Sequence, residues 1–587
     1  MHRKYLFALF FVFAHSVFAD IPYRVQFDGV GDRTTLDVLR SVSQLVLLSD
    51  NPPATETGLQ RRAEADIPNL IQGLQSLGHY EPNVQVSVDT GPTPAVIHID
   101  IDLGPTYTLE SFEIISDSIE DFPCSQISLK RLGITIGRPI LPITILNAES
   151  SLLNYLVSYG YPLASITKRE VIANEETQTI SVILRVSSGP PACFGTTTID
   201  GTLQTSDFVI LKKIYWNYGE PYSPAKIEKT RQELEAAGLF CSVDITSAEE
   251  LEDGQYLPMF IAVTESRHRT VGLGLSYNTE LGPGFTGSWE HRNIRSMGEK
   301  IRLHTDLWKD RQRGILLYTQ PDLYCPGQDL LWIAEAERNR TKGFTENFVT
   351  LSAIMDRRLN DYTKYSYGVA FKQLESEDTA DDNGSFTLLK LPVTWRWTNA
   401  DSLLDPSMGT TLFYLGTPTF QIINPRMFYM IQTLTLMNYL PLTKDCRHIL
   451  AGKAHIGTIS GETKKAIPAP ERFYAGSENT LRGYRYLTVS PLNAENDPVG
   501  GRSIMIYSLE LRSRITQTIG WVTFFDIGNV YSPVWPVFNH KQLKSVGAGL
   551  RYHTPVGPLR ADFAIPLNRR KGIDNKWELY ISIGQAF

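Results

Sequence analysis

Few residues of this chain have the types and spacing that catalysis requires. Ser165 and Lys168 fit the Ser-x-x-Lys pattern of a serine nucleophile with a lysine base, but they lie in a strand-like segment without the motifs that accompany that pattern. The sequence has no Gly-x-Ser-x-Gly elbow, no His-Glu-x-x-His helix and no Walker phosphate loop, and its 11 His residues are dispersed. We therefore expect no enzyme, no cofactor and no metal site.

Charged residues inside strand-like segments are the other candidates for chemistry. Between residues 559 and 565 the odd positions are apolar, whereas Arg560 and Asp562 fall on the opposite face. Residues 503–512 alternate in the same way and place Glu510 on the charged face. Charges on one face of a strand are tolerable when that face lines the polar interior of a membrane barrel. The alternative, a soluble β-sandwich, would place its charges outside, so the pattern favours a barrel with a charged lumen.

The last eleven residues, 577–587, predict a membrane-crossing β-strand. Apolar residues occupy nearly every second position, and about ten residues is the length that a tilted strand needs to cross a bilayer. Taken alone, the segment also fits the last strand of a soluble β-domain. The residues that we single out in it are Trp577, Tyr580, Gly584 and Phe587.

The first residues predict export. Residues 2–4 are basic, residues 5–14 form a short apolar core, and small residues precede Ala19, so we expect a signal peptide at 1–19. Asp20 follows the expected cleavage point, and without a Cys there a lipoprotein anchor is not indicated. No later segment reaches the roughly 18 consecutive apolar residues of a membrane helix.

Between residues 22 and 266 a unit of about eighty residues occurs three times. In each copy a Leu precedes a Gly by four residues at the end of a helical stretch, where the Leu packs inward and the Gly ends the helix. Two strand-like runs follow, so each copy predicts a small α+β module of strand, helix, helix, strand, strand. The pairs are Leu74 and Gly78, Leu156 and Gly160, and Leu234 and Gly238.

From residue 267 onward the pattern changes to long strands separated by Gly, Pro, Asn and Asp. We count about sixteen candidate strands, and an even number brings both ends of the barrel to the side of the repeats. The connection between the eleventh and twelfth strands, residues 460–500, is far longer than a hairpin needs, which is typical of a functional loop. It contains two aromatic and glycine motifs, Arg472-Phe473-Tyr474-Ala475-Gly476 and Leu481-Arg482-Gly483-Tyr484.

These loop motifs resemble the loop signature of the outer-membrane protein assembly superfamily, also called the bacterial surface antigen family, which includes the BamA and TamA branches. Residues 524–528 resemble its aromatic-x-Asp-x-Gly strand motif. The resemblance implies that the loop folds back into the lumen, where Arg482 meets Asp526 first and Glu510 second. The lumen network that we expect is Arg482, Gly483, Tyr484, Glu510, Asp526 and Gly528.

The three repeats resemble the periplasmic POTRA domains of the same superfamily. The implied fold is a set of α+β POTRA repeats followed by an all-β transmembrane barrel of about 16 antiparallel strands. Three repeats favour the TamA branch, since five are typical of BamA and two of two-partner secretion transporters. The expected boundaries are a signal peptide at 1–19, POTRA domains at 20–105, 106–190 and 191–266, and the outer-membrane barrel at 267–587.

The resemblance implies an assembly factor that inserts β-barrel and autotransporter proteins at the seam between the first and last barrel strands. Phe587 resembles the terminal aromatic signal of barrel proteins. The implied partners are the outer-membrane bilayer, unfolded outer-membrane protein clients and a TamB-type protein anchored in the inner membrane. Rival functions are a polypeptide secretion pore of the two-partner type, phospholipid transport to the outer membrane, and a structural tether. Residues that weaken strand pairing near the seam are Gly272, Gly274, Gly282, Gly284, Gly584 and Ala586.

Net charge and cysteine content bear on the partners of the protein and on its disulfide bonds. A net charge of -7 argues against nucleic acid as a partner. The chain has 5 Cys, of which Cys193 and Cys241 fall in one predicted repeat, and the sequence leaves open whether they are bridged or reduced.

Overall fold

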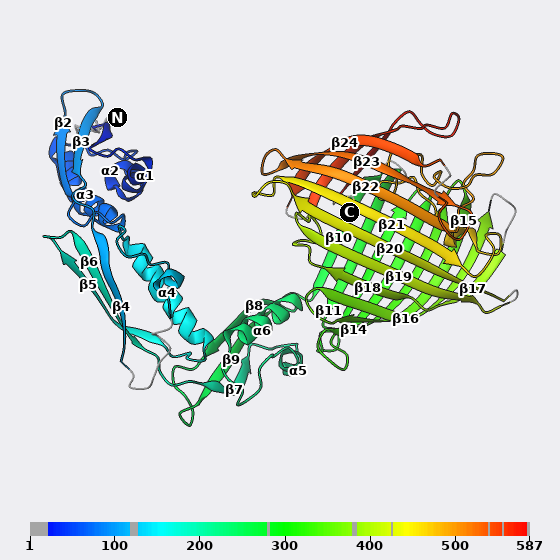
Figure 1. Cartoon of the computed structure of the whole chain (residues 1–587), viewed down its shortest axis with the longest axis horizontal. Coiled ribbons are helices and arrows are strands. Elements are labelled where there is room, and N and C mark those ends of the chain that lie inside the picture. The colour runs from blue at the N-terminus through cyan, green and yellow to red at the C-terminus, as the bar shows by residue number, and fades with distance from the viewer. Residues whose placement is uncertain are drawn as a thin grey trace, which may run out of the picture. The chain divides into compact units, whose positions relative to one another are not determined.

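The computed structural model divides the chain into two compact units, which we describe one at a time (Figure 1). One unit comprises Met1–Thr198, Tyr215–Lys229 and Ile245–Phe260, and the other comprises Ile199–Ile214, Thr230–Asp244 and Ile261–Phe587. The expected signal peptide, Cys124, Gly584 and Phe587 lie outside the residues that the structure describes. The described residues are 21–117, 127–278, 282–378, 384–423, 426–537, 541–554 and 557–583.

The first repeat is a three-stranded sheet with helices, in which β1 runs parallel to β3 and β2 runs antiparallel to β3. Its core is apolar and includes Leu39, Leu70, Leu74 and Ile97. The buried Asp66 carboxylate accepts hydrogen bonds from the Ser43 hydroxyl at 2.6 Å and the Gln44 backbone N–H at 2.9 Å, which joins two of the helices. The elements are β1 (Tyr23–Asp28), α1 (Arg33–Val42), α2 (Gln44–Leu47), α3 (Glu56–Ser76), β2 (Asn83–Asp89) and β3 (Ala95–Asp102).

The second and third repeats have the same strand order as the first, with the third strand between the other two. The described part of the second contains β4 (Thr108–Ser116), η2 (Leu129–Leu132), α4 (Pro142–Ser158), β5 (Ser165–Asn174) and β6 (Thr179–Ser187). The third consists of β7 (Cys193–Asp200), α5 (Asp207–Leu211), α6 (Pro224–Ala236), β8 (Phe240–Ser247) and β9 (Tyr256–Glu265). Cys193 and Cys241 are both free, so no disulfide joins them.

The Leu and Gly pairs of the repeats have the predicted conformations. Each Leu is fully buried, and each Gly has a positive φ of 89°, 95° and 67° in turn. An L side chain is strained at such φ values, so Gly is the residue that ends these helices at least cost. The prediction of helix ends at Gly78, Gly160 and Gly238 is confirmed.

Over the described residues, the second unit is dominated by a single sheet of seventeen antiparallel segments, β10 to β26. Segments β17 and β18 both pair with β16 and β19, so they occupy one position that is interrupted at Pro392, which has no N–H to donate. Sixteen positions result, and the expected barrel of about sixteen strands is confirmed. Among the described residues, no helix combines the length and apolar character needed to cross a membrane.

The barrel segments are β10 (Arg269–Asn278), β11 (Gly282–Arg292), β12 (Lys300–Trp308), β13 (Arg311–Gln320), β14 (Gln328–Arg340), β15 (Phe344–Arg358), β16 (Thr363–Asp378), β17 (Gly384–Lys390), β18 (Val393–Thr398), β19 (Gly409–Gln421), β20 (Met427–Pro441), β21 (His448–Ser460), β22 (Ser503–Arg514), β23 (Ile519–Tyr531), β24 (Leu543–Thr554), β25 (Gly557–Pro566) and β26 (Glu578–Ile583).

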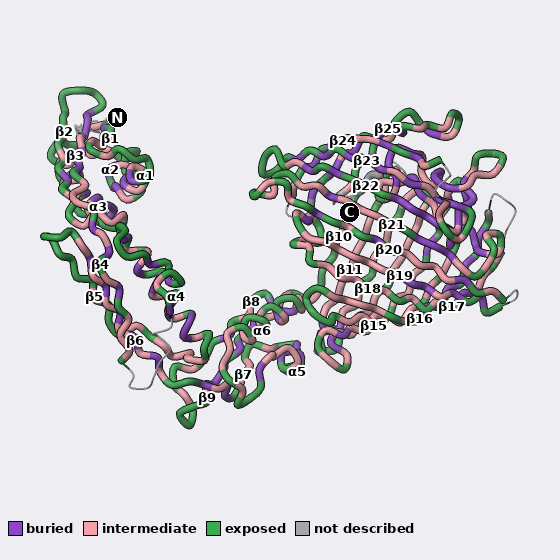
Figure 2. The backbone as a smooth tube through the Cα atoms, viewed as in Figure 1, coloured by how far each residue is buried: buried purple, intermediate pink, exposed green. Residues whose placement is uncertain are grey.

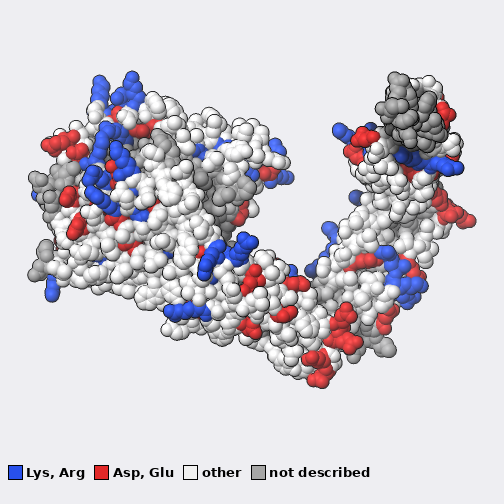
Figure 3. All heavy atoms as spheres, turned by 180° about the vertical axis from the view of Figure 1, so that it is seen from behind, with Lys and Arg blue, Asp and Glu red and all other residues white. Residues whose placement is uncertain are grey.

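Burial alternates along β22, β23 and β25 as the sequence predicts for β22 and β25 (Figure 2). On β22, Leu509 is exposed and Glu510 is buried; on β25, Phe563 is exposed and Asp562 is buried. The apolar residues therefore face outward and the charged residues face the lumen. A large area of the outer wall carries no charged side chain in the view of Figure 3.

The first and last strands approach each other without pairing over the described residues. Cα atoms of β10 and β26 come within 8 Å, but no β-ladder joins them there. Leu273 and Leu275 on β10 are 75% and 91% exposed, compared with 43% for Leu303 on β12, which has a neighbour on each side. The outer face of β10 is thus more open than that of a strand within the sheet.

At the start of the barrel, Glu265 holds the loop before α5. Its carboxylate accepts backbone hydrogen bonds from Leu203, Gln204 and Thr205 at 3.1, 3.0 and 2.7 Å. Burial raises the pKa of Glu265, but the hydrogen bonds from Gln204 and Thr205 outweigh that effect and lower it to about 2. Folding therefore favours the carboxylate form.

This shift predicts an acid-sensitive third repeat. Because the folded pKa is about 2 and the usual value is 4.5, the stabilisation by Glu265 is complete above about pH 4.5 and is lost as the pH falls towards 2. Calorimetry of the full chain in detergent should show that Glu265→Gln lowers the melting temperature of the repeats at neutral pH and flattens their loss of stability in acid. The exposed Glu250→Gln variant is the control, and equal pH slopes for Glu265→Gln and the unmodified chain would contradict the prediction.

Candidate functional site in the barrel lumen

The loop between β21 and β22 packs against the luminal face of the barrel. Leu481, Tyr484 and Val489 of the loop are fully buried and form one apolar cluster with luminal residues such as Ile504 and Val530. Burial of these large side chains removes apolar surface from water and fixes the loop inside the lumen. The loop contains the helical turn η3 (Ala469–Glu471).

The guanidinium of Arg482 binds two strands at once. Its Nε and Nη2 donate to the two carboxylate oxygens of Asp526 on β23 at 2.7 and 2.8 Å. Its Nη1 donates to Glu510 on β22 at 2.6 Å, and its backbone N–H also reaches Asp526, at 3.2 Å. Arg482 is 1% exposed and both carboxylates are 0% exposed, so these are shielded, charge-assisted hydrogen bonds. The structure thus brings together the three charged residues singled out in the sequence.

Further charges complete the network. Asp562 on β25 lies 3.5 Å from Arg482 and pairs with Arg551 on β24, while Arg512 donates to Glu510 at 2.9 Å. The guanidinium of Arg482 also lies 3.5 Å above the ring of Phe524. Three carboxylates and three guanidinium groups therefore offset one another, as buried charges require. The sequence analysis placed Asp562 on the charged face of its strand, but the network that it predicted did not include Asp562, Arg512 or Arg551.

The glycine and tyrosine after Arg482 connect the loop to the last strands. Gly483 has a φ of 85°, which favours glycine, and its N–H donates to the Tyr580 hydroxyl on β26 at 3.0 Å. The Tyr484 hydroxyl donates to Asn568 at 2.6 Å. Gly528 on β23 leaves room for the backbone of Met505, which an added Cβ would meet.

The residues predicted for the C-terminal strand separate into two groups. Tyr580 is buried and takes part in the loop contact, whereas Trp577 lies on the outer face and packs on Phe563 with ring centroids 5.6 Å apart. Gly584 and Phe587 lie outside the described residues. Trp577 is therefore not part of the lumen network.

A second ionic contact fixes the other end of the loop. The buried Glu471 carboxylate on η3 accepts from Lys372 on β16 at 2.9 Å and from Lys390 on β17 at 2.6 Å. The neighbouring Arg472 donates to the backbone carbonyls of Ile467 and Val499, both at 2.9 Å, and so closes the loop on itself. The sequence analysis missed this contact, whose one signal was that Glu471 directly precedes the Arg472 motif.

These two contacts have opposite polarity. At Arg482 the loop supplies the cation and the wall supplies the anions, whereas at Glu471 the loop supplies the anion and the wall supplies the cations. Among the described residues, no group of His, Cys, Asp and Glu has the geometry of a metal site. The arrangement holds the loop in place at both of its ends.

Loss of the Arg482 side chain should destabilise the folded barrel. Arg482→Ala leaves Asp526 and Glu510 buried without their main partner, at a cost of about 3–5 kcal/mol. We expect the variant to lose compact migration in gel electrophoresis at a lower temperature than the unmodified protein. Arg482→Lys keeps the charge but not the two-pronged geometry and should fall between them. The exposed Arg447→Ala is the control, and an unchanged transition for Arg482→Ala would contradict a stabilising role.

Neutralising Glu471 should release the loop on the side of β16 and β17. Glu471→Gln leaves Lys372 and Lys390 without a carboxylate, so we expect larger or more frequent openings in single-channel conductance measurements on the purified barrel. Glu495→Gln changes an exposed carboxylate of the same loop and should behave like the unmodified protein. If Glu471→Gln and Glu495→Gln gave the same conductance, Glu471 would not hold the loop.

Two segments of the chain match known protein families. Residues 293–587, half of the chain, match the Omp85 superfamily domain, and residues 194–265 match the POTRA family described as the surface antigen variable number repeat. The second match coincides with the third repeat, and the first covers nearly the whole barrel.

Relatives and solved structures agree with these matches. The chain is 23% identical over 459 residues to the outer membrane protein assembly factor BamA of Nitratidesulfovibrio vulgaris and 22% identical over 495 residues to that of Neisseria meningitidis. These alignments cover 76% and 74% of this chain but only 58% and 61% of the relatives. The crystal structure of Haemophilus ducreyi BamA lacking POTRA domains 1–3 superposes with a TM-score of 0.69 at 16% identity, covering 82% of this chain and 100% of that one.

The superposition on that structure shows a shared fold, and at 16% identity it shows no more than the fold. The match to the Omp85 domain shows the family. The relatives are named as assembly factors, and that activity belongs to them. Membership also places the barrel in the outer membrane and the repeats in the periplasm. The chain belongs to the Omp85 superfamily, as an outer-membrane β-barrel preceded by periplasmic POTRA domains.

Proposed function

We propose that this protein assembles outer-membrane β-barrel proteins, including autotransporters, at the seam between β10 and β26. The observation that carries the proposal is the absence of a ladder between these strands over the part of the chain that the structure describes. In lipid, unpaired backbone N–H and C=O groups cost several kcal/mol each, so such an edge favours any strand that completes its hydrogen bonds. An incoming client strand supplies those bonds by strand addition.

The composition of β10 supports this use of the seam. Gly272 and Gly274 lie opposite Ser288 and Thr286 on β11, and the hydroxyl groups of these two residues occupy the space that a Cβ would fill. Glycine contributes no side-chain packing to a strand, so Gly272 and Gly274 weaken the packing of β10 against β11. The strand is therefore suited to opening.

The loop is attached to one side of the seam. Through the hydrogen bond from Gly483 to Tyr580 it holds β26, and through Arg482 it holds β22 and β23. We infer that the lumen network keeps the β26 side in place while the β10 side moves. The wall that receives a client strand then keeps its shape during insertion.

The repeats offer edges for capturing extended segments. In the second repeat, β5 pairs with β6 in the strand order β4-β6-β5 and forms one edge of the sheet, with Val171 and Ile172 exposed. An edge of this kind binds an extended peptide through main-chain hydrogen bonds with little demand on its sequence. We infer that the edges take up unfolded clients or a TamB-type partner. The presence of three repeats supports the TamA branch.

A reconstitution experiment tests the seam. The chain without its native cysteines is placed in liposomes with an autotransporter client, and a disulfide is introduced between β10 and β26. We expect the unlocked protein to accelerate client assembly, the locked form to lose that acceleration, and a reductant to restore it.

The matched control is a disulfide between Ala334 on β14 and Leu351 on β15, which are already paired. This control should leave assembly unchanged. Normal assembly by the seam-locked form would overturn insertion at the seam. A client that passed into the liposome interior through the lumen would favour a secretion pore, and assembly no faster than in empty liposomes would favour a tether.

A further inference from the structure

Helix α5 of the third repeat presents an apolar face away from its own core. Phe208 and Leu211 are 48% and 51% exposed, while Val209 and Ile210 between them are buried. Residues three apart lie on the same side of a helix, so the two exposed side chains form one surface. Leu203, in the loop just before the helix, is also exposed. Exposed large apolar groups that gather in this way mark an interaction surface.

The helix is fixed to the barrel turns within the same compact unit. The Ser206 backbone N–H donates to the Ser296 carbonyl at 2.8 Å, and Asn293 donates to the Thr205 hydroxyl at 2.9 Å. Lys213 forms an ion pair with Asp322 at 2.7 Å, and both side chains are largely buried. These contacts set α5 on the turn between β11 and β12 and on the turn between β13 and β14.

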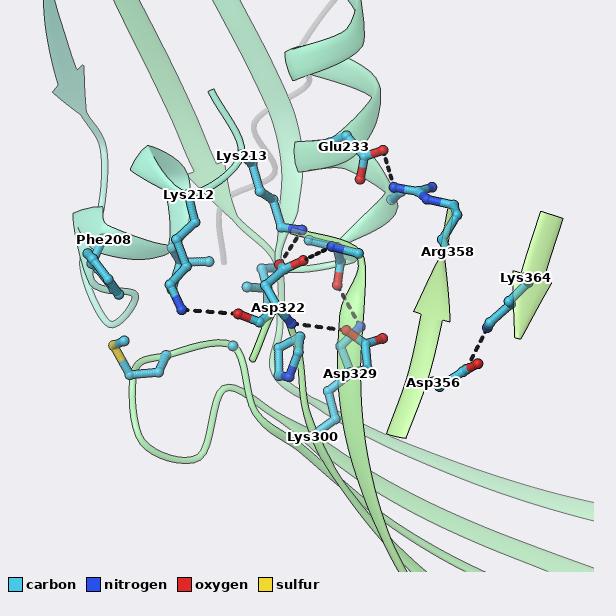
Figure 4. Close-up of a pocket in the computed structure, with 18 residues that line it drawn as sticks. Phe208, Lys212, Lys213, Glu233, Lys300, Asp322, Asp329, Asp356, Arg358 and Lys364 are labelled. Carbon is cyan, nitrogen blue, oxygen red and sulfur yellow. Dashed lines mark hydrogen bonds and ion pairs between the residues drawn. The ribbon is translucent and has the colours of Figure 1, made fainter. Parts of the chain in front are cut away.

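A pocket of about 240 Å³ lies beneath this contact, between α5, α6 and the same turns (Figure 4). Its walls carry further ion pairs, Arg358 with Glu233 and Lys364 with Asp356, and Lys300 donates to the Ala237 carbonyl at the end of α6 at 2.7 Å. The charges of the pocket are thus largely paired with one another. These contacts join α6 to the barrel, and Phe208 of α5, which also lines the pocket, remains 48% exposed.

The depth of these turns follows from the outward-facing aromatic residues of the barrel. Trp289 lies three residues before the end of β11, and Trp332 lies four residues after the start of β14. Both face outward, as does Tyr367 near the start of β16. Aromatic side chains on the lipid face form girdles at the level of the headgroups. At about 3.3 Å per residue, the turns beyond Trp289 and Trp332 lie within roughly 10–15 Å of that girdle.

The two turns that hold α5 carry exposed apolar and basic groups of their own. Ile294, Met297 and Tyr324 are exposed, and so is Arg295. Lys212 donates to the Asp322 carbonyl at 3.3 Å and lies 4.8 Å from the Phe208 ring. We call this surface the α5 rim; it consists of Leu203, Phe208, Leu211, Lys212, Ile294, Arg295, Met297 and Tyr324.

We propose that the α5 rim lies in the phospholipid headgroup layer on the periplasmic side of the outer membrane. The rim is continuous with the lipid-facing wall, because its turns join the ends of strands whose outer faces are apolar. Apolar side chains next to Lys and Arg suit an interface where acyl chains meet phosphate groups. The α5 segment, which belongs to the same compact unit as the barrel, then contacts the bilayer directly.

Spin labels on the full chain test this placement. Single cysteines at Leu211, at Leu303 on the lipid-facing wall and at the exposed Glu64 of the first repeat are introduced into a cysteine-free background. The protein is reconstituted without other proteins into vesicles of phosphatidylethanolamine and phosphatidylglycerol. Accessibility to oxygen, which concentrates in the bilayer, is compared with accessibility to a water-soluble nickel complex.

We expect the label at Leu211 to favour oxygen, as at Leu303, and the label at Glu64 to favour nickel. A label at Leu211 that matches Glu64 would overturn the proposal and leave the rim for a protein partner. Compact migration of each labelled variant in gel electrophoresis shows that its barrel is folded. A larger share of phosphatidylglycerol should raise the oxygen preference at Leu211, and less so in Lys212→Gln; no response to phosphatidylglycerol in either protein would overturn the role of the basic groups.

Discussion

The buried guanidinium of Arg482 is the interaction on which the architecture of the lumen depends. Its three nitrogens bind Glu510 on β22 and Asp526 on β23, and the backbone N–H of Arg482 adds a fourth hydrogen bond, to Asp526. A cation placed there without carboxylates would be strongly destabilising, and the carboxylates would be equally costly without cations. Glu510, Asp526 and Asp562 can therefore be buried at low cost in free energy only because arginines face them. The wall and the loop form one electrostatic unit.

Period-two alternation was sufficient to predict which residues of β22 and β25 face the lumen, because each of these strands carries that information locally. It placed Glu510 and Asp562 on the luminal face. Knowing the face of a residue, however, does not tell which other residue it contacts. The pairing of Asp562 with Arg551 depends on the register between two strands, and that of Glu471 with Lys372 depends on where a long loop settles. The partners of Arg482 could be predicted only from the resemblance to a family. The sequence did not predict the interruption at Pro392, because the segments on both sides of it have the residue pattern of a strand.

The third repeat has two structural roles. By sequence it is the last of three similar modules, yet residues 199–214 and 230–244 belong to the same compact unit as the barrel. The reason is local, since Glu265 and Asn293 bind the loop before α5 and Lys213 binds a barrel turn. A repeat pattern reports how a module folds internally and does not report what its surface residues bind. The residues that make this junction, Lys213, Glu265 and Asn293, are not part of the Leu and Gly pattern that defines the repeats.

The contacts of the loop also bear on the order in which the protein itself folds. Arg482 finds Glu510 and Asp526 at sequence separations of 28 and 44 residues, and Gly483 finds Tyr580 at 97. The meeting of β10 with β26 spans about three hundred residues, and loop-closure entropy makes such distant contacts slower to form. The C-terminal hairpins can therefore capture the loop before the cylinder is complete. The newly made protein would then close around a lumen that is already occupied, without passing through an open channel.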